Sequence, residues 1–228
     1  MSRLAVLVVM AGVLGCSDVT EGAGGVVQLE IRVPVVTTVE VGETLQLSAQ
    51  ALDRDGNPVS VPISWRTADA TLTVNDAGVV TGVAAGTGQV QAFAGSLSSE
   101  RVALTIITRA DTLVLAGDSV VTVAAGVTAS TPLVVQLQSF ASATPLPSRP
   151  VVYTVTSPPD IGTRSVELPG GILIDTVSTG STGLNETVTL SRVAGIPSPD
   201  TAIVQVRSYR TSGADVPGSG QRFIVLFQ

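Results

Sequence analysis

Histidine and lysine are absent from the sequence, and cysteine occurs once, at Cys16. Their absence excludes Ser-His-Asp and Cys-His nucleophiles, lysine Schiff bases and the usual zinc and copper sites. Carboxylates alone remain for acid-base chemistry, and we expect neighbouring carboxylates to lie in turns, where solvation keeps them ionised. The sequence therefore predicts a protein without catalytic residues, metal or cofactor. A glycoside hydrolase with paired carboxylates is the one enzyme class that the composition leaves open.

Concentrated positive charge is also absent. All 12 basic residues are arginines, they form no run, and the formal net charge is -6 with an isoelectric point near 4.5. Because phosphate binding needs a cationic face, we exclude nucleic acid as a partner. Aromatic residues make up only 3% of the chain, whereas small and β-branched aliphatic residues dominate the 44% that is hydrophobic. This composition favours an all-β protein.

Long apolar runs are missing except at the N-terminus, where the segment from Leu4 to Gly15 follows the positive start Met1-Ser2-Arg3. As a helix this segment would rise about 18 Å, which is well short of the ~30 Å hydrocarbon core of a membrane. We therefore interpret residues 1–15 as a signal peptide rather than a membrane span.

The segment Val13-Leu14-Gly15-Cys16 resembles the lipobox of bacterial lipoproteins. The resemblance implies that the thiol of Cys16 carries an acyl chain and that Cys16 begins the mature protein. It further implies several acyl chains, which is what stable anchoring requires, and Ser17 after the cysteine points by the same analogy to the outer membrane. Residues 16–26 then form the lipidated cysteine and a flexible tether. The alternative is an ordinary signal peptide cut nearby, with Cys16 incidental.

Strand signals follow one another closely from Val27 onward. In residues 44–51 apolar and polar side chains alternate strictly, which places the leucines and alanines on one face of a strand. Trp65 continues the apolar phase of Val61 and Ile63, so we expect its ring in the core rather than stacked on a sugar. We expect a glycine-rich turn at 84–88. About seven short strands, with turn signals every 8–12 residues, are typical of an immunoglobulin-like sandwich.

Several linked motifs of this region resemble the bacterial immunoglobulin-like group 2 domain of intimin- and invasin-type surface proteins. The similarity covers residues 27–108 and implies a non-catalytic stalk or adhesion module, without any catalytic residue to transfer. The motifs are Val41-Gly42-Glu43-Thr44-Leu45-Gln46-Leu47, Asp55-Gly56-Asn57-Pro58-Val59, Ser64-Trp65, Asp76-Ala77-Gly78-Val79-Val80-Thr81-Gly82-Val83 and Ala85-Gly86-Thr87.

Residues 109–228 alternate in the same way and predict a second sandwich of about seven strands. Prolines and β-branched residues interrupt every window with helical periodicity. The run Val152-Tyr153-Thr154-Val155, with segments 179–183 and 187–190, is loosely similar to the invasin-type (group 1) immunoglobulin-like repeat. The predicted fold is therefore all-β, with two tandem immunoglobulin-like β-sandwiches after a lipoprotein signal peptide.

Asp53, Asp55 and Asn57 have the spacing of the start of a calcium loop, with Gly56 between them. The complete loop needs a glutamate further along, whereas Pro58 leads straight into a predicted strand. We interpret the segment as a turn in which the side chains bond local amides, and calcium remains the alternative.

Two aromatic residues are candidate ligand contacts. Phe93 is out of phase with its inward-facing neighbours and Tyr209 is isolated, so we expect both rings at the surface. The sequence as a whole predicts a non-enzymatic cell-envelope lipoprotein that serves as a stalk, adhesion or protein-interaction module. Its partner would be an envelope or surface protein or a glycan, and its membrane contact the lipid anchor only. The alternative is an accessory carbohydrate-binding lipoprotein.

Overall fold

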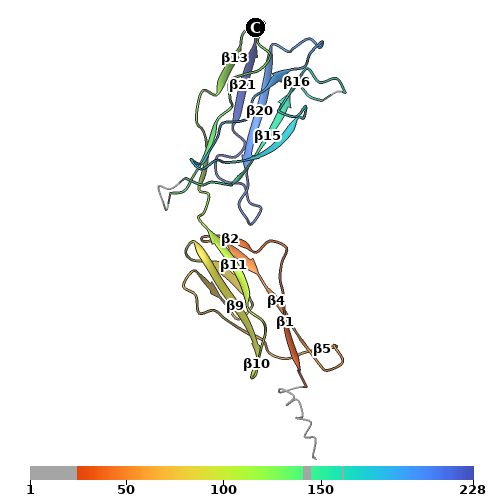
Figure 1. Ribbon diagram of the computed structural model, residues 1–228, viewed down its shortest axis with the longest axis vertical. Helices are drawn as coiled ribbons and strands as arrows, with labels where there is room; N and C mark the ends of the chain where they lie inside the picture. Colours follow the sequence, from red (N-terminus) through yellow and green to blue (C-terminus); the bar gives the residue numbers. More distant parts are fainter. Residues whose placement is uncertain (1–24, 141–144, 161) are drawn as a thin grey trace, which may run out of the picture.

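The computed structural model describes residues 25–140, 145–160 and 162–228. Within these ranges the chain forms strands β1 to β21 and no helix, which confirms the all-β prediction (Figure 1). In the same ranges no helix is long and apolar enough to cross a membrane. Cys16 and nearly all of the predicted tether lie outside the described residues.

The first domain consists of two facing layers of antiparallel strands with one parallel pair. One layer contains the sheets β1-β4-β5 and β3-β8-β7, and the other contains β10-β9-β11-β2 with β6 paired to β9. The strands are β1 (Gln28–Arg32), β2 (Thr38–Glu40), β3 (Thr44–Gln46), β4 (Ser48–Leu52), β5 (Pro58–Val59), β6 (Ser64–Arg66), β7 (Leu72–Val74), β8 (Val79–Gly82), β9 (Gly86–Ala94), β10 (Leu97–Ser98) and β11 (Val102–Ile107).

The first strand of this domain is divided between the two layers. Its first half, β1, pairs antiparallel with β4, and its second half, β2, pairs parallel with β11. Pro34 lies in the crossing segment, where the missing amide hydrogen costs no ladder bond. This division gives each layer an outer strand from the same stretch of chain.

The second domain repeats this arrangement. Its first strand is divided into β12, antiparallel to β14, and β13, parallel to β21, and the larger sheet has the order β13-β21-β20-β15-β17. The opposite layer contains β12-β14-β18, and β16 pairs with β19. The strands are β12 (Thr112–Leu115), β13 (Val120–Val123), β14 (Val135–Gln138), β15 (Pro150–Ser157), β16 (Val166–Glu167), β17 (Ile174–Ser178), β18 (Leu184–Asn185), β19 (Ser191–Arg192), β20 (Thr201–Ser208) and β21 (Arg222–Phe227). Both domains thus have an immunoglobulin-like strand order.

Each domain encloses its own hydrophobic core. Trp65 is buried in the first core, as its phase in the sequence predicts. Tyr153 and Phe223 are the largest fully buried side chains of the second core. The Tyr153 hydroxyl donates a hydrogen bond to the Leu133 carbonyl at 2.9 Å, so the one polar atom of this ring is satisfied inside the core.

Two local expectations need correction. The segment 84–88 is not a turn throughout, because β9 already begins at Gly86. A Cβ on Gly88 would lie 2.6 Å from the Leu72 side chain, so glycine here permits close strand packing. The alternation of Val188 and Leu190 predicts a strand with both side chains inward. Both are buried, but they lie outside any strand, and their carbonyls accept single bonds from the Leu133 and Ser130 amides, respectively.

Candidate functional site

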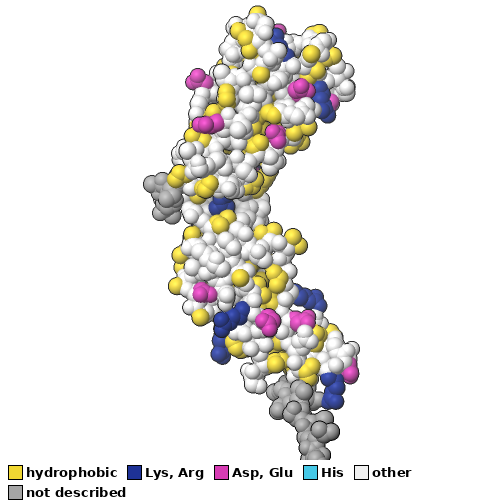
Figure 2. All heavy atoms as spheres, viewed as in Figure 1, with side chains coloured by type: hydrophobic (Ala, Val, Ile, Leu, Met, Phe, Trp, Pro, Cys, Tyr) yellow, Lys and Arg dark blue, Asp and Glu magenta, His cyan; other side chains and the backbone are white. Residues whose placement is uncertain are grey.

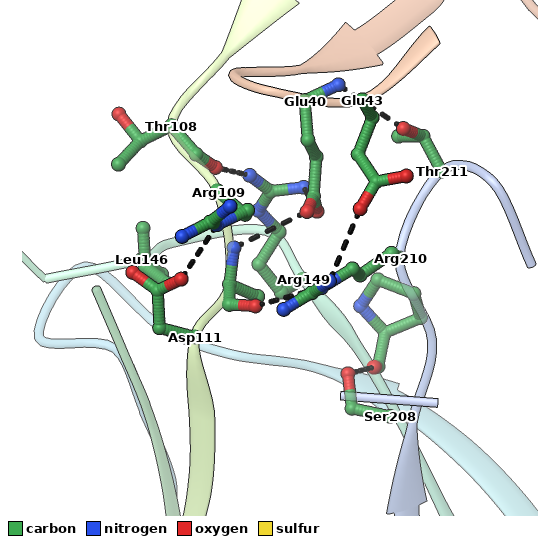
Figure 3. A network of polar contacts seen from close by, with 12 residues as sticks. Glu40, Glu43, Thr108, Arg109, Asp111, Leu146, Arg149, Ser208, Arg210 and Thr211 are labelled. Atoms are coloured by element: carbon green, nitrogen blue, oxygen red, sulfur yellow. Dashed lines mark hydrogen bonds and ion pairs between the residues drawn. The ribbon is translucent and has the colours of Figure 1, made fainter. Parts of the chain in front are cut away.

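The junction between the two domains contains a network of buried and half-buried polar side chains (Figure 3). The connecting segment between β11 and β12 is only residues 108–111. Its backbone is bonded on both sides: the Ala110 amide donates to Glu40 Oε2 at 3.3 Å, and the Ala110 carbonyl accepts from Arg210 Nε at 3.1 Å. The Asp111 amide donates to the Gln138 carbonyl at 2.9 Å. The connection is therefore held in place rather than free to swing.

Glu40, the last residue of β2, is the centre of the network. Its side chain is 0% exposed, and its Oε1 accepts a hydrogen bond from Arg149 Nη1 at 2.9 Å. Its amide donates to the Thr211 hydroxyl at 3.1 Å, and its carbonyl accepts from the Glu43 amide at 2.9 Å. One residue of the first domain thus bonds the linker and two separate segments of the second domain.

Arg149 lies directly before β15 of the second domain and is 9% exposed. Besides Glu40, its guanidinium donates to the Thr108 carbonyl of the linker. Its own backbone is fixed by Thr179, whose hydroxyl accepts from the Arg149 amide at 3.0 Å and whose amide donates to the Arg149 carbonyl at 2.9 Å. These backbone hydrogen bonds hold Arg149 in place while its guanidinium contacts the first domain.

The loop after β20 supplies the second set of contacts. Arg210 Nη1 forms an ion pair with Glu43 Oε1 at 3.1 Å, and both side chains are about one-fifth exposed. The Arg210 amide donates to the Ala214 carbonyl and the Gly213 amide to the Arg210 carbonyl, with Gly213 at φ +84°. This closed loop holds Arg210 and Thr211 toward the first domain (Figure 3).

A further ion pair stabilises the linker itself. Arg109 Nε lies 2.6 Å from Asp111 Oδ1, and the other carboxylate oxygen accepts from the Phe140 amide at 2.7 Å and the Ser139 hydroxyl at 3.2 Å. Burial acts to raise the pKa of Asp111, but these donors together outweigh it and hold that pKa below its ordinary value of 3.8. Asp111 is thus a stable anion that fixes the start of the second domain.

The Glu40–Arg149 pair has the electrostatics of a buried ion pair. Burial raises the pKa of Glu40 above its ordinary value of 4.5, because the charge of Arg149 and the Ala110 amide offset desolvation only in part. Burial likewise lowers the pKa of Arg149, and the charge of Glu40 opposes this shift. Removing one partner of such a pair typically costs about 3–5 kcal/mol, because the other charge is left buried alone.

The sequence analysis considered neighbouring carboxylates in turns and did not single out Glu40, whose carboxylate is buried and whose pKa is raised by that burial. Its two carboxylate oxygens are occupied by Arg149 and by the Ala110 amide, which leaves the group bonded within the protein. The arrangement therefore joins two domains. The sequence signal was a charged residue inside the apolar stretch Val39-Glu40-Val41, but its partner lies 109 residues away.

The two aromatic residues singled out in the sequence, Phe93 and Tyr209, lie in different domains. Phe93 is half-buried on β9, opposite Ser98 of β10, at the end of the first domain remote from the junction (Figure 1). Its ring is covered by the Arg66 guanidinium at 4.8 Å. Tyr209 is 41% exposed and directly precedes Arg210 at the junction. The structure does not bring these two rings together.

The segment that resembled a calcium loop is a turn bonded to its own side chain. One carboxylate oxygen of Asp53 accepts from the amides of Asp55 at 2.9 Å and Asn57 at 2.8 Å. The hydrogen bond from the Asn57 amide is the main cause that lowers the pKa of Asp53. In the described part of the chain, no group of three or more acidic residues is placed to hold a metal ion. Cys16, the predicted lipidation site, lies outside the described residues.

Comparison with known proteins finds likenesses among solved structures alone. No protein-family model and no curated protein matches the sequence. The adhesin InvE of Yersinia pseudotuberculosis is 15% identical over 91% of this chain and 61% of its own length, with a TM-score of 0.40. The chain therefore spans less than two thirds of that adhesin structure.

Two further solved structures are similar to the chain over most of their length. The fibronectin(III)-like modules of CbhA from Clostridium thermocellum are 16% identical over 88% of this chain and 94% of theirs, with a TM-score of 0.42. The D0-D1 domain of intimin is 17% identical over 87% of this chain and 98% of its own, with a TM-score of 0.30.

Proposed function

We propose that the protein is a non-enzymatic lipoprotein of the bacterial cell envelope whose two immunoglobulin-like domains form a stiff interaction stalk. The observation that carries this proposal is the buried Glu40–Arg149 pair, which joins the domains across a linker of residues 108–111. Relative motion is the usual expectation for two domains on one chain unless their interface holds them. Here charged groups from both domains are buried together, so bending the joint would expose or unpair them.

The arrangement of the chain supports a spacer role. The two domains lie end to end, and the strands nearest the C-terminus reach the pole opposite β1 (Figure 1). An acylated Cys16 would hold the first domain near a membrane through the tether of residues 16–26, while the second domain stands farther out. Loops at the far pole are then free to contact an envelope or surface protein, since binding residues commonly lie on loops of a rigid scaffold.

The stiffness of the joint is measured by electron–electron distance spectroscopy. The full chain carrying Cys16→Ser has no cysteine, so spin labels at Glu30→Cys and Thr122→Cys, both exposed, report one distance between the domains. We expect a narrow distance distribution that broadens in Arg149→Ala. The control is Arg207→Ala, which removes an exposed ion pair with Asp215 within the second domain and leaves the width unchanged.

A wide distribution in the parent chain would contradict a stiff stalk. A melting curve of Arg149→Ala separates a loosened joint, in which both domains still unfold cooperatively, from loss of folding. The lipid anchor is tested in bacteria by feeding a clickable fatty acid. We expect the label to appear on the full chain, and to vanish together with membrane association in Cys16→Ala; labelling that persists in the variant would refute the anchor.

The alternative of accessory carbohydrate binding is favoured by one observation, the aromatic ring of Phe93 in a groove of the first domain that arginine and glutamine residues also line. Carbohydrate binding of this kind would use the face of a sheet in the first domain and not the joint between the domains. The two roles are compatible, because a stalk can carry a binding face along its side.

A further inference from the structure

A groove of ≈ 290 Å³ lies on the outer face of the sheet formed by β6, β9 and β11 in the first domain. Inward residues of these strands, such as Trp65 and Val90, belong to the core, so the groove is built from the alternate, outward residues. The side chains that determine its character are Arg66, Asp69, Gln89, Gln91, Phe93 and Arg101.

Arg66 and Arg101 lie on either side of β9, both at the level of Gln91. Arg66 pairs with Gln91 across β6 and β9. On the other side of β9, Ser98 is paired with Phe93 and Val102 with Val90. Between these two pairs β9 has two residues, whereas the facing chain has three. Glu100 and Arg101 therefore both lie opposite Gln91, as in a β-bulge, which re-aims side chains. Adjacent strands are about 4.8 Å apart, so Arg66 and Arg101 lie on either side of Gln91, and all three residues line the groove.

Two arginines and one aspartate line the groove, whereas Glu100, the neighbour of Arg101, is not a lining residue. Neither Arg66 nor Arg101 forms an ion pair with any carboxylate among the described residues, although the chain as a whole carries a net charge of -6. Asp69 is the one acidic residue that lines the groove, and its Oδ2 accepts from the Gln89 amide at 2.6 Å. In the view of Figure 2, basic and acidic side chains are scattered over both domains.

Hydrogen-bonding groups in the groove are partly preorganised. Gln91 Nε2 donates to the Ser99 carbonyl at 2.7 Å, which orients the amide and leaves its oxygen as an acceptor. The Arg66 guanidinium lies over the Phe93 ring at 4.8 Å, which restrains this long side chain. Fixing a side chain before binding reduces the entropy lost when a ligand arrives.

We infer that this groove binds a uronic-acid polysaccharide, with Arg66 and Arg101 holding carboxylates and the Gln91 side-chain oxygen accepting from a sugar hydroxyl. This inference deepens the carbohydrate-binding alternative and does not depend on the stiffness of the joint. Guanidiniums suit carboxylates because they offer paired donors in a planar fork. A polyuronate presents carboxylates and hydroxyls together along an extended chain, which matches a groove with both cations and an amide acceptor.

The position of β9 favours a glycan over an acidic peptide. Extended peptides commonly bind by adding a strand to a free sheet edge. β9 lies inside its sheet, with β6, β10 and β11 as hydrogen-bonded neighbours. The groove above it therefore offers side chains alone, so a peptide could not bind there through a backbone ladder.

The experiment is calorimetric titration of the full chain in detergent with oligogalacturonate, at 20–50 mM salt. We expect saturable binding that weakens as salt is raised. Arg66→Ala and Arg101→Ala should each weaken it about tenfold or more, since each removes a charge-assisted hydrogen bond. The matched control is Arg222→Ala, an exposed arginine on β21 of the second domain, which should bind like the parent.

Three outcomes with sugar ligands would overturn the inference. They are no binding of oligogalacturonate by the parent, equal binding of a neutral oligoglucan, and binding that persists in both arginine variants. Tighter binding of polyglutamate than of oligogalacturonate would also overturn it, in favour of an acidic peptide. Melting curves of the variants confirm that their folds are intact. Failure of this test leaves the distance measurement at the joint, and so the stalk proposal, unaffected.

Discussion

The two domains share the pairing of their first and last strands but reach it with unlike sequences. In each, the first strand is split, so that one half pairs antiparallel with a neighbour and the other half pairs parallel with the last strand. The first core contains Trp65, whereas the second buries Tyr153 and Phe223. The shared features are alternation and turn geometry, so strand order here depends on pattern rather than on particular core residues.

One turn geometry recurs in both domains. In five loops the first amide donates to the fifth carbonyl, the fourth amide donates to the first carbonyl, and the fourth residue is a glycine with φ between +73° and +84°. Glycine is suited to this left-handed conformation because it has no Cβ. The loops are residues 53–57 and 75–79 in the first domain and 168–172, 180–184 and 210–214 in the second.

The difference lies in the first residue of these loops. In the first domain it is Asp53 or Asn75, whose side chain accepts from two amides of its own loop. In the second domain the loop at the junction begins with Arg210, whose side chain instead contacts the first domain. The loop at 210–214 is closed by backbone hydrogen bonds and its glycine, so the side chain of Arg210 is available for contact between the domains.

Trp65→Ala is expected to make the stabilities of the two domains differ most strongly. Removing a buried tryptophan costs about 3–5 kcal/mol, a large part of the about 5–15 kcal/mol that stabilises a domain. The first domain should lose its melting transition while the second keeps its own. Near-ultraviolet circular dichroism follows both, because the sole tryptophan is in the first domain and both tyrosines are in the second. A variant that melts like the parent would show that the ring contributes little to the core.

Gly78→Ala and Gly56→Ala form a matched pair within the first domain. Both glycines are the fourth residue of the same loop type, at φ +78° and +80°, so both variants carry the left-handed penalty of about 1–2 kcal/mol. A Cβ on Gly78 would also lie 2.8 Å from Trp65 Cε2 and from the Leu47 carbonyl, whereas one on Gly56 meets nothing within 4 Å. We expect Gly78→Ala to cost about 2–4 kcal/mol by denaturant unfolding. Equal costs would contradict the packing described here.

The smallest expected effect is on pH dependence, where Glu40 and Asp111 should differ in sign. The folded pKa of Glu40 is raised, so the folded state binds more protons just above pH 4.5 and this group's contribution to stability falls as pH rises through that window. The folded pKa of Asp111 is lowered, so its contribution is present above pH 3.8 and is lost as pH falls through the folded pKa.

Denaturant unfolding between pH 3 and 7 checks these signs. The stability difference between the parent and Glu40→Gln should decrease with rising pH above 4.5, and that between the parent and Asp111→Asn should increase with pH below 3.8. Constant offsets from altered hydrogen bonding do not affect these slopes. A Glu40→Gln difference that is flat or rises with pH would show that Arg149 fully compensates the burial of Glu40.

The sequence predicted the parts of the fold that depend on local pattern. Alternation at period 2 placed Trp65 and Val90 in the core, and Asp53 with Gly56 indicated a tight turn. These features were predictable because each depends on residues only a few positions apart. The start of β9 at Gly86 was missed because glycines there serve close packing of a strand, and not a turn.

The junction was not predictable in the same way. Glu40 and Arg149 are 109 positions apart, and each alone is typical of an exposed strand end. Glu40 and Arg149 are buried only because the two domains meet, and the local periodicity of the sequence carries no information about that contact. Of the residues that line the groove, the sequence singled out Phe93 as a candidate ligand contact, and that role stays a prediction. Arg66 and Arg101 were not singled out, because their placement on either side of Gln91 depends on the register between strands.

The parallel pairing of the first and last strands in each domain has a mechanical consequence. In both β2 with β11 and β13 with β21, the chain enters and leaves the domain along neighbouring strands that point the same way. A pull applied at the two poles of the molecule therefore runs along these ladders, and their hydrogen bonds share the load at once instead of opening one after another.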